Sequence, residues 1–210
     1  MSFRRKYYDI FSLVYDFIIQ LHSKDEAASL RSYIVDKANV PNESKVLDIC
    51  TGTGSVAIAF SRKFGVKLMV VAVDFSRGML RRAKKKITIM GLKNIYMVEA
   101  NVCALPFKDS MFESVTCSHA FYELKGQERE KTLKEVVRTL KEDGKFLMME
   151  HEIPTNLILR MLFYVRMYTM GSRDAKVFLE NDTLPFKGYF RKVEKLITPS
   201  GRSKLICSKR

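Results

Sequence analysis

The stretch Lys45-Val-Leu-Asp-Ile-Cys-Thr-Gly-Thr-Gly-Ser-Val-Ala57 constrains the fold more than any other part of the chain. Its opening is a β-prone apolar run, which predicts a buried strand. Gly52 and Gly54 follow directly and allow the backbone to turn tightly beside a ligand. Because the apolar residues after Gly54 recur at helical spacing, we expect a strand, a glycine loop and a helix in succession, as in a nucleotide-cofactor site.

An acidic residue after the next predicted strand supports this interpretation. The apolar run that begins at Lys67 ends at Asp74, which predicts a parallel strand buried on both faces. Asp74 follows the Gly-x-Gly-x-x-Ala loop at about 20 residues, the spacing of an acid that binds ribose hydroxyls. Capping of the next helix is the alternative role. These features alone do not separate a nicotinamide cofactor from S-adenosylmethionine.

Asp48, just before the glycine turn, separates the two cofactors. A dinucleotide would place two phosphates over the loop, and like-charge repulsion disfavours a carboxylate beside them. S-adenosylmethionine has no phosphate but carries an ammonium and a sulfonium, which a carboxylate attracts. The sequence therefore favours S-adenosylmethionine over NAD, with a tight turn that binds no ligand as the remaining alternative.

Length and composition indicate one domain with a substantial core. The chain has 210 residues, of which 47% are hydrophobic. It shows no secretory leader and no apolar run long enough to span a bilayer, so we expect a cytoplasmic protein, with membrane association as an alternative. No metal site is expected. The four cysteines form no C-x-x-C pair and are expected to be reduced, although Cys50 and Cys117 could lie side by side.

Apolar patterns predict strands alternating with helices. The expected strands cover residues 45–49, 67–74, 94–98, 111–118 and 145–150, and the expected helices cover 3–21, 25–37, 76–91 and 127–140, with Gly144 ending the last helix. This order predicts an α/β fold with a doubly wound, mostly parallel sheet. Segments 189–197 and 204–207 flank a turn and should add an antiparallel hairpin.

We expect these elements to form a single domain in four parts. Residues 1–40 are interpreted as a helical cover, 41–152 as the cofactor-binding core, 153–187 as a lid or substrate region, and 188–210 as the terminal hairpin. The helix over 3–21 contains two Tyr-Asp dipeptides, which could line a substrate pocket or simply pack on the core.

The apolar helix expected over 157–170 leaves three possibilities open. It is too short to span a bilayer and contains arginines, so it is buried, forms a lid over the site, or lies in a membrane interface. The net charge of +14 favours an anionic partner such as a lipid surface, an acidic small molecule or nucleic acid. The basic run from Arg81 to Lys86 is interpreted as a solvated helix face or an anionic contact.

Four blocks of sequence resemble class I S-adenosylmethionine-dependent methyltransferases. They are Val-Leu-Asp-Ile-Cys-Thr-Gly-Thr-Gly, Val-Asp-Phe-Ser-x-x-Met-Leu, Ala-Asn-Val-x-Ala-Leu-Pro-Phe and Leu-Lys-Glu-Asp-Gly-Lys-Phe-Leu. Over residues 7–152 the chain is most similar to the ubiquinone/menaquinone-biosynthesis C-methyltransferase group. The resemblance implies seven strands in the order 3-2-1-4-5-7-6. The residues expected to bind the cofactor are Asp48, Thr51, Gly52, Thr53, Gly54, Asp74, Phe75, Met79, Asn101, Val102 and Ser118.

The resemblance implies a small-molecule acceptor, such as a prenylated quinol or another apolar, membrane-derived compound. Residues 151–187 do not match the substrate region of quinone methyltransferases, so the acceptor stays open. His119, at the end of the fourth expected strand, is the leading candidate base, with Tyr122 as a positioning group and His151 as a weaker candidate. The alternatives are an RNA methyltransferase and a regulatory protein that binds the cofactor without turnover.

Overall fold

The computed structural model describes residues 29–169 and 178–210, without the side chains of 159, 163 and 166–169. The helix predicted over 3–21, with its Tyr-Asp dipeptides, lies outside the described residues, as does the start of the helix predicted over 25–37. The remainder of that second helix is present, because residues 29–38 are helical.

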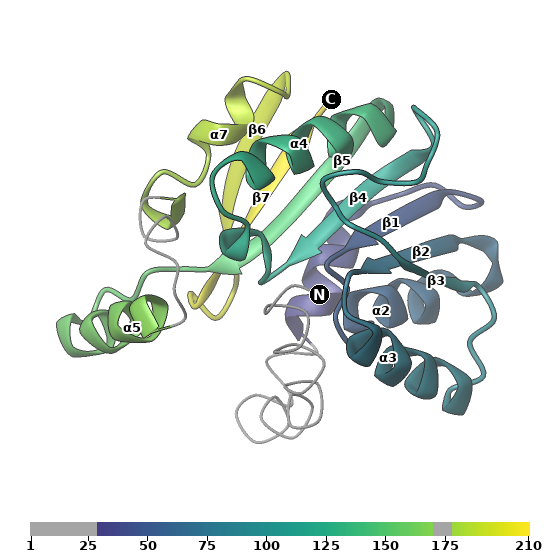
Figure 1. The fold of residues 1–210 in the computed structure, drawn as a ribbon, viewed down its shortest axis with the longest axis horizontal. Coiled ribbons are helices and arrows are strands. Elements are labelled where there is room, and N and C mark those ends of the chain that lie inside the picture. The colour runs from purple at the N-terminus through teal and green to yellow at the C-terminus, as the bar shows by residue number, and fades with distance from the viewer. Residues whose placement is uncertain (1–28, 170–177) are drawn as a thin grey trace.

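The described chain forms one seven-stranded sheet in the order β3-β2-β1-β4-β5-β7-β6 (Figure 1). The first five strands are parallel, whereas β7 pairs antiparallel with both β5 and β6. This confirms the predicted doubly wound sheet and its terminal hairpin. The strands are β1 (Lys45–Ile49), β2 (Met69–Asp74), β3 (Ile95–Glu99), β4 (Phe112–Ser118), β5 (Leu140–His151), β6 (Lys192–Ile197) and β7 (Ser203–Lys209).

Helices connect the parallel strands and cover the sheet. Ser76 begins α3 as predicted, because its hydroxyl accepts a hydrogen bond from the Met79 amide. The labelled helices are α2 (Ser55–Phe64), α3 (Arg77–Ile89), α4 (Gln127–Thr139), α5 (Leu157–Thr169) and α7 (Leu184–Lys187), with short 3₁₀ turns η1 (Gly65–Lys67) and η2 (Phe121–Glu123).

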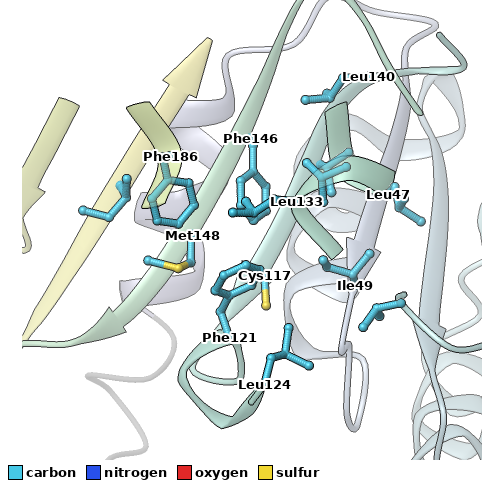
Figure 2. Packing of buried hydrophobic residues seen from close by; sticks show 14 of the residues in the cluster. Leu47, Ile49, Cys117, Phe121, Leu124, Leu133, Leu140, Phe146, Met148 and Phe186 are labelled. Atoms are coloured by element: carbon cyan, nitrogen blue, oxygen red, sulfur yellow. The ribbon is translucent and has the colours of Figure 1, made fainter. Parts of the chain in front are cut away.

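Two apolar layers pack on opposite faces of the sheet, because alternate strand residues point to opposite sides. One layer joins the central strands to α4 and α7, and the other joins them to α2 and the helix at 29–38. Figure 2 shows the first layer, in which Leu133 of α4 and Phe186 of α7 lie over Phe146 and Met148 of β5. Burial of each such side chain stabilises the fold by roughly 1.5–3 kcal/mol.

Helix α5 differs from the other helices in how little of its apolar surface is covered. Asn156 begins it, with Oδ1 accepting a hydrogen bond of 3.0 Å from the Ile158 amide. Leu157, Ile158, Met161, Leu162 and Val165 are exposed, so full burial, one of the three alternatives, is wrong for this face. Within the described residues no helix combines the length and apolar character needed to cross a bilayer.

The start of β5 differs most from its predicted position. β5 begins at Leu140, directly after α4, rather than at Lys145, so Gly144 lies inside the strand and does not end the helix. The pairing with β4 shifts register here, which indicates a β-bulge. A Cβ on Gly144 would lie 2.8 Å from the carbonyl oxygen of Lys141. The glycine is therefore required by close approach of two backbone segments.

Gly144→Ala is expected to lower the free energy of unfolding by about 1–3 kcal/mol, because the added methyl group collides with backbone atoms that cannot rotate away. Gly188→Ala is the matched control, since a Cβ there meets nothing within 4 Å. We expect the control to change stability by no more than about 0.5 kcal/mol. Urea unfolding measures both variants, and equal losses would contradict the steric account.

Candidate functional site

The glycine loop after β1 is tightly turned. Cys50, Gly52 and Gly54 all have positive φ angles, of 53°, 55° and 78°. The Thr51 amide donates a 2.9 Å hydrogen bond to the Val73 carbonyl oxygen, which ties the loop to β2. A Cβ on Gly54 would lie 3.1 Å from the Cβ of Ala83, whereas one on Gly52 would meet open space. The loop is thus packed against α3 on one side and open at Gly52 on the other.

Asp48 lies beneath this loop and is only 1% exposed. Its Oδ2 accepts a 2.5 Å hydrogen bond from the Thr51 hydroxyl, and its Oδ1 accepts one of 2.7 Å from Thr116 of β4. Burial raises the pKa of Asp48 to about 6, against the opposing effect of these hydrogen bonds. The carboxylate therefore links the loop to β4 and stays close to its ionisation point at neutral pH.

Asp74, at the carboxyl end of β2, holds the loop from the other side. Its Oδ2 accepts a 2.8 Å hydrogen bond from the Gly52 amide, and its Oδ1 accepts one of 2.9 Å from the Ser76 amide. Burial raises the pKa of this carboxyl as well. Because each carboxylate oxygen has a second lone pair, Asp74 can still accept from the two hydroxyls of a ribose.

The two buried carboxylates suit a cationic ligand better than a phosphate. Among the described residues, neither Asp48 nor Asp74 forms an ion pair with a lysine or arginine. Lys86 of α3 reaches the loop, where its Nζ donates a 2.9 Å hydrogen bond to the Thr53 hydroxyl. Two desolvated carboxylates without a cationic partner suit the ammonium and sulfonium of S-adenosylmethionine, because opposite charge would favour their ionised forms.

The residues expected to hold the adenosine lie farther along the same edge. Val102 is buried, whereas Asn101 is exposed and its Oδ1 accepts a 2.9 Å hydrogen bond from the Cys103 amide. Met79 is buried behind the start of α3, and Phe75 is half-buried between β2 and that helix. All four follow the ends of β2 and β3, which are paired parallel strands.

A second group of side chains gathers where β4 and β5 end. His119 has a positive φ of 53°, and its amide donates a 2.7 Å hydrogen bond to the Met149 carbonyl oxygen. Its Nδ1 lies 3.0 Å from the Ser118 hydroxyl, and its Nε2 lies 3.2 Å from the hydroxyl of Ser203 on β7. The ring centroid of His151 lies 4.5 Å from that of His119. The structure thus brings both candidate bases together.

The comparisons with known proteins agree with this geometry. Residues 4–182 match the model of the ubiE/COQ5 methyltransferase family. The chain belongs to that family. It is 30% identical over 168 residues to the ubiquinone/menaquinone biosynthesis C-methyltransferase UbiE of Blochmanniella floridana, which covers 80% of this chain and 65% of that protein. It is 27% identical over 199 residues to the demethylmenaquinone methyltransferase of Shouchella clausii, covering 89% of this chain and 84% of that protein.

The family assignment confirms the predicted resemblance to the ubiquinone/menaquinone-biosynthesis methyltransferases. A solved structure supports the fold. A SAM dependent methyltransferase from Aquifex aeolicus superimposes with a TM-score of 0.70 at 17% identity, covering 92% of this chain and 97% of that chain. The chain spans 65% of the length of the Blochmanniella relative.

Glu150, next to the histidines, was not predicted from the sequence as a site residue. This carboxyl is fully buried on β5, and its Oε1 accepts a 3.1 Å hydrogen bond from the Tyr122 amide. No described group donates to its Oε2, and burial raises its pKa to about 8. Tyr122 is itself buried in the core, with its ring 6.2 Å from that of His151. An acid inside an apolar strand was the signal that could have revealed Glu150.

The cysteines are as expected. All four are free thiols, and Cys117 is buried on β4. The pKa of Cys117 is raised well above its ordinary value, first by a hydrogen bond with Cys50 and then by burial. The two thiols thus lie side by side, and Cys117, held protonated, is a poor nucleophile.

Glu150→Gln is expected to remove a pH-dependent loss of stability. The folded protein keeps this carboxyl protonated up to a pKa of about 8, whereas its ordinary value is 4.5. Between these values folding takes up a proton, so stability falls as pH rises, by at most about 1.4 kcal/mol per pH unit. The neutral amide of glutamine abolishes this contribution.

Urea unfolding of the wild type and of Glu150→Gln between pH 5 and pH 8 measures this difference. The control is Glu142→Gln, because the side chain of Glu142 is 82% exposed. Parallel stability curves for the wild type and Glu150→Gln would show that Glu150 ionises normally.

Proposed function

We propose that this family member transfers a methyl group from S-adenosylmethionine to a ring carbon of a prenylated quinol. The observation that carries the proposal is the family match over residues 4–182, which includes both the glycine loop and the two histidines. Two of its relatives are named for ubiquinone/menaquinone biosynthesis and for demethylmenaquinone. A phenolic ring is also the kind of acceptor that needs a base, for which the site offers candidates.

The glycine loop and Asp74 would hold the cofactor at the carboxyl ends of β1 and β2, where open α/β sheets bind ligands. Asp48 would act from beneath the loop, attracting the positive charges without touching them, since this residue is only 1% exposed. Asn101 and Val102 would border the adenine. When bound, S-adenosylmethionine supplies an already activated methyl group, so the protein chiefly aligns the acceptor and excludes water.

His119 is the proposed base. Removal of a hydroxyl proton from the quinol would place negative charge on the ring and make the adjacent carbon nucleophilic. After that carbon has taken the methyl group, its own hydrogen would leave as a proton and the ring oxygen would regain one, which restores the aromatic quinol. One imidazole nitrogen of His119 would take the hydroxyl proton in place of its present hydroxyl contact, which is Ser203 at 3.2 Å for Nε2 and Ser118 at 3.0 Å for Nδ1, while the other contact holds the ring. His151 lies beside it and would pass the proton on toward solvent, since both rings are only half-buried. Tyr122 would act by packing against His151.

Methyl transfer from labelled cofactor into a demethylated prenyl quinol tests the proposal. His119→Asn is expected to lower kcat by about 10²–10⁴-fold, the usual contribution of a general base, with little change in cofactor affinity. Asparagine is chosen because it tolerates the left-handed backbone found at this position. Ser110→Asn is the matched control, since Ser110 also has a positive φ, of 52°, but is exposed and lies at the opposite end of β4.

Other acceptors give different results in the same experiment. Label that enters RNA instead of the lipid-soluble fraction would replace the quinol with a nucleic-acid acceptor, which the charge of +14 suggested. Calorimetric binding of S-adenosylmethionine without label in any fraction would indicate a binding protein that does not turn over.

A further inference from the structure

Helix α5 presents a continuous apolar face that the described chain leaves open. The exposed fractions are 71% for Leu157, 68% for Ile158, 62% for Met161, 56% for Leu162 and 55% for Val165. Residues at these spacings share one side of a helix. Figure 1 shows α5 beyond the carboxyl end of β5, projecting from the body of the sheet. Contiguous apolar surface of this kind marks an interaction site.

The opposite side of α5 is attached to the protein. The Tyr164 hydroxyl donates a 3.1 Å hydrogen bond to the Glu180 carboxylate, and both Tyr164 and Arg160 are half-buried. The apolar face is therefore directed outward by contacts on the other side of the helix. A helix that packed on its own sheet would turn its apolar face toward the sheet.

The charge of α5 indicates what covers its apolar face. Its sequence, LILRMLFYVRMYT, contains two arginines and no acidic residue. The whole chain carries a formal charge of +14, which would draw it to an anionic surface and would oppose pairing of two copies. The 13 residues of α5 give a length of about 20 Å, shorter than the roughly 30 Å of a bilayer core. Such a helix lies along an interface.

We propose that α5 docks on the surface of an anionic lipid bilayer, with its apolar face among the acyl chains and the positive charge of the protein drawn to the phosphates. The helix begins six residues after His151, where β5 ends, so docking would hold the carboxyl edge of the sheet at the bilayer surface. A lipid-soluble molecule could then reach His119 and His151 without crossing water. The inference stands on the helix itself and does not depend on which acceptor is methylated.

Co-sedimentation of the full chain with vesicles tests the proposal. The wild type is expected to bind vesicles of equal parts phosphatidylglycerol and phosphatidylcholine about tenfold or more tightly than vesicles of phosphatidylcholine alone. The double variant Met161→Glu with Val165→Glu should lose at least about tenfold in binding to the anionic vesicles, because it places two carboxylates in the apolar face.

The matched control is Val66→Glu with Ile89→Glu. These residues are 82% and 74% exposed and lie outside α5, so the control adds the same charge to apolar surface elsewhere. It should bind anionic vesicles within about threefold of the wild type. Both double variants should bind S-adenosylmethionine as the wild type does, and methyl transfer to a water-soluble, short-chain quinol should continue, which separates this test from that of the acceptor.

Two results would overturn the proposal. One is equal vesicle binding by the wild type and the α5 variant, which would place any lipid contact elsewhere. The other is a wild type that ignores anionic vesicles but forms dimers, measured by sedimentation equilibrium, that Met161→Glu with Val165→Glu dissociates. That outcome would make a second copy of the chain the occupant of this face.

Discussion

The cost of burying two carboxylates beside one glycine loop organises this molecule. Asp48 and Asp74 are both nearly inaccessible, and no lysine or arginine of the described chain forms an ion pair with either. Desolvation raises both pKa values, and the charge of Asp74 adds to the effect on Asp48. Hydrogen bonds from Thr51, Thr116 and two backbone amides offset only part of that cost. A cationic ligand would supply the missing charge.

The topology of the sheet brings the two halves of the site together. Order β3-β2-β1-β4-β5 places the carboxyl ends of all five parallel strands at one edge, with the change of direction between β1 and β4. The residue that follows each of these two strands has a left-handed backbone conformation: Cys50 after β1 and His119 after β4. These corners direct the glycine loop and the imidazole toward the same edge. The antiparallel pairing of β7 with β5 places Ser203 opposite His151 and within hydrogen-bond distance of His119.

Local patterns were sufficient to predict most of the fold. The bounds of β1 were predicted almost to the residue, because burial on both faces gives a parallel strand a continuous apolar run. Those of α4 were predicted as closely, because its apolar residues recur at helical spacing. The prediction that Gly144 ends the helix was wrong, although a glycine after a helical pattern usually marks a helix end. The close approach of the Lys141 carbonyl oxygen explains why a glycine is present at this position inside β5.

The site was predicted less completely than the fold. Asp74 and the glycines could be predicted to lie together because their spacing follows the loop motif, and the hydrogen bond from the Gly52 amide to Asp74 joins them. Thr116 and Ser203 were missed, because each acts through a contact far along the chain, 68 residues from Asp48 and 84 residues from His119. The burial of Glu150 likewise depends on η2 folding back over β5. Such long-range contacts leave no periodicity in the sequence.

The affinity for S-adenosylmethionine as a function of pH tests the central claim most directly. If a cationic cofactor lies over Asp48, whose pKa is about 6, then affinity measured by calorimetry should fall below pH 6, by at most about tenfold per pH unit, as this carboxylate takes up a proton. In Asp48→Asn the affinity should be weaker and nearly constant from pH 5 to pH 7. An unchanged pH profile in that variant, or tighter binding of NADH than of S-adenosylmethionine by the wild type, would contradict the account.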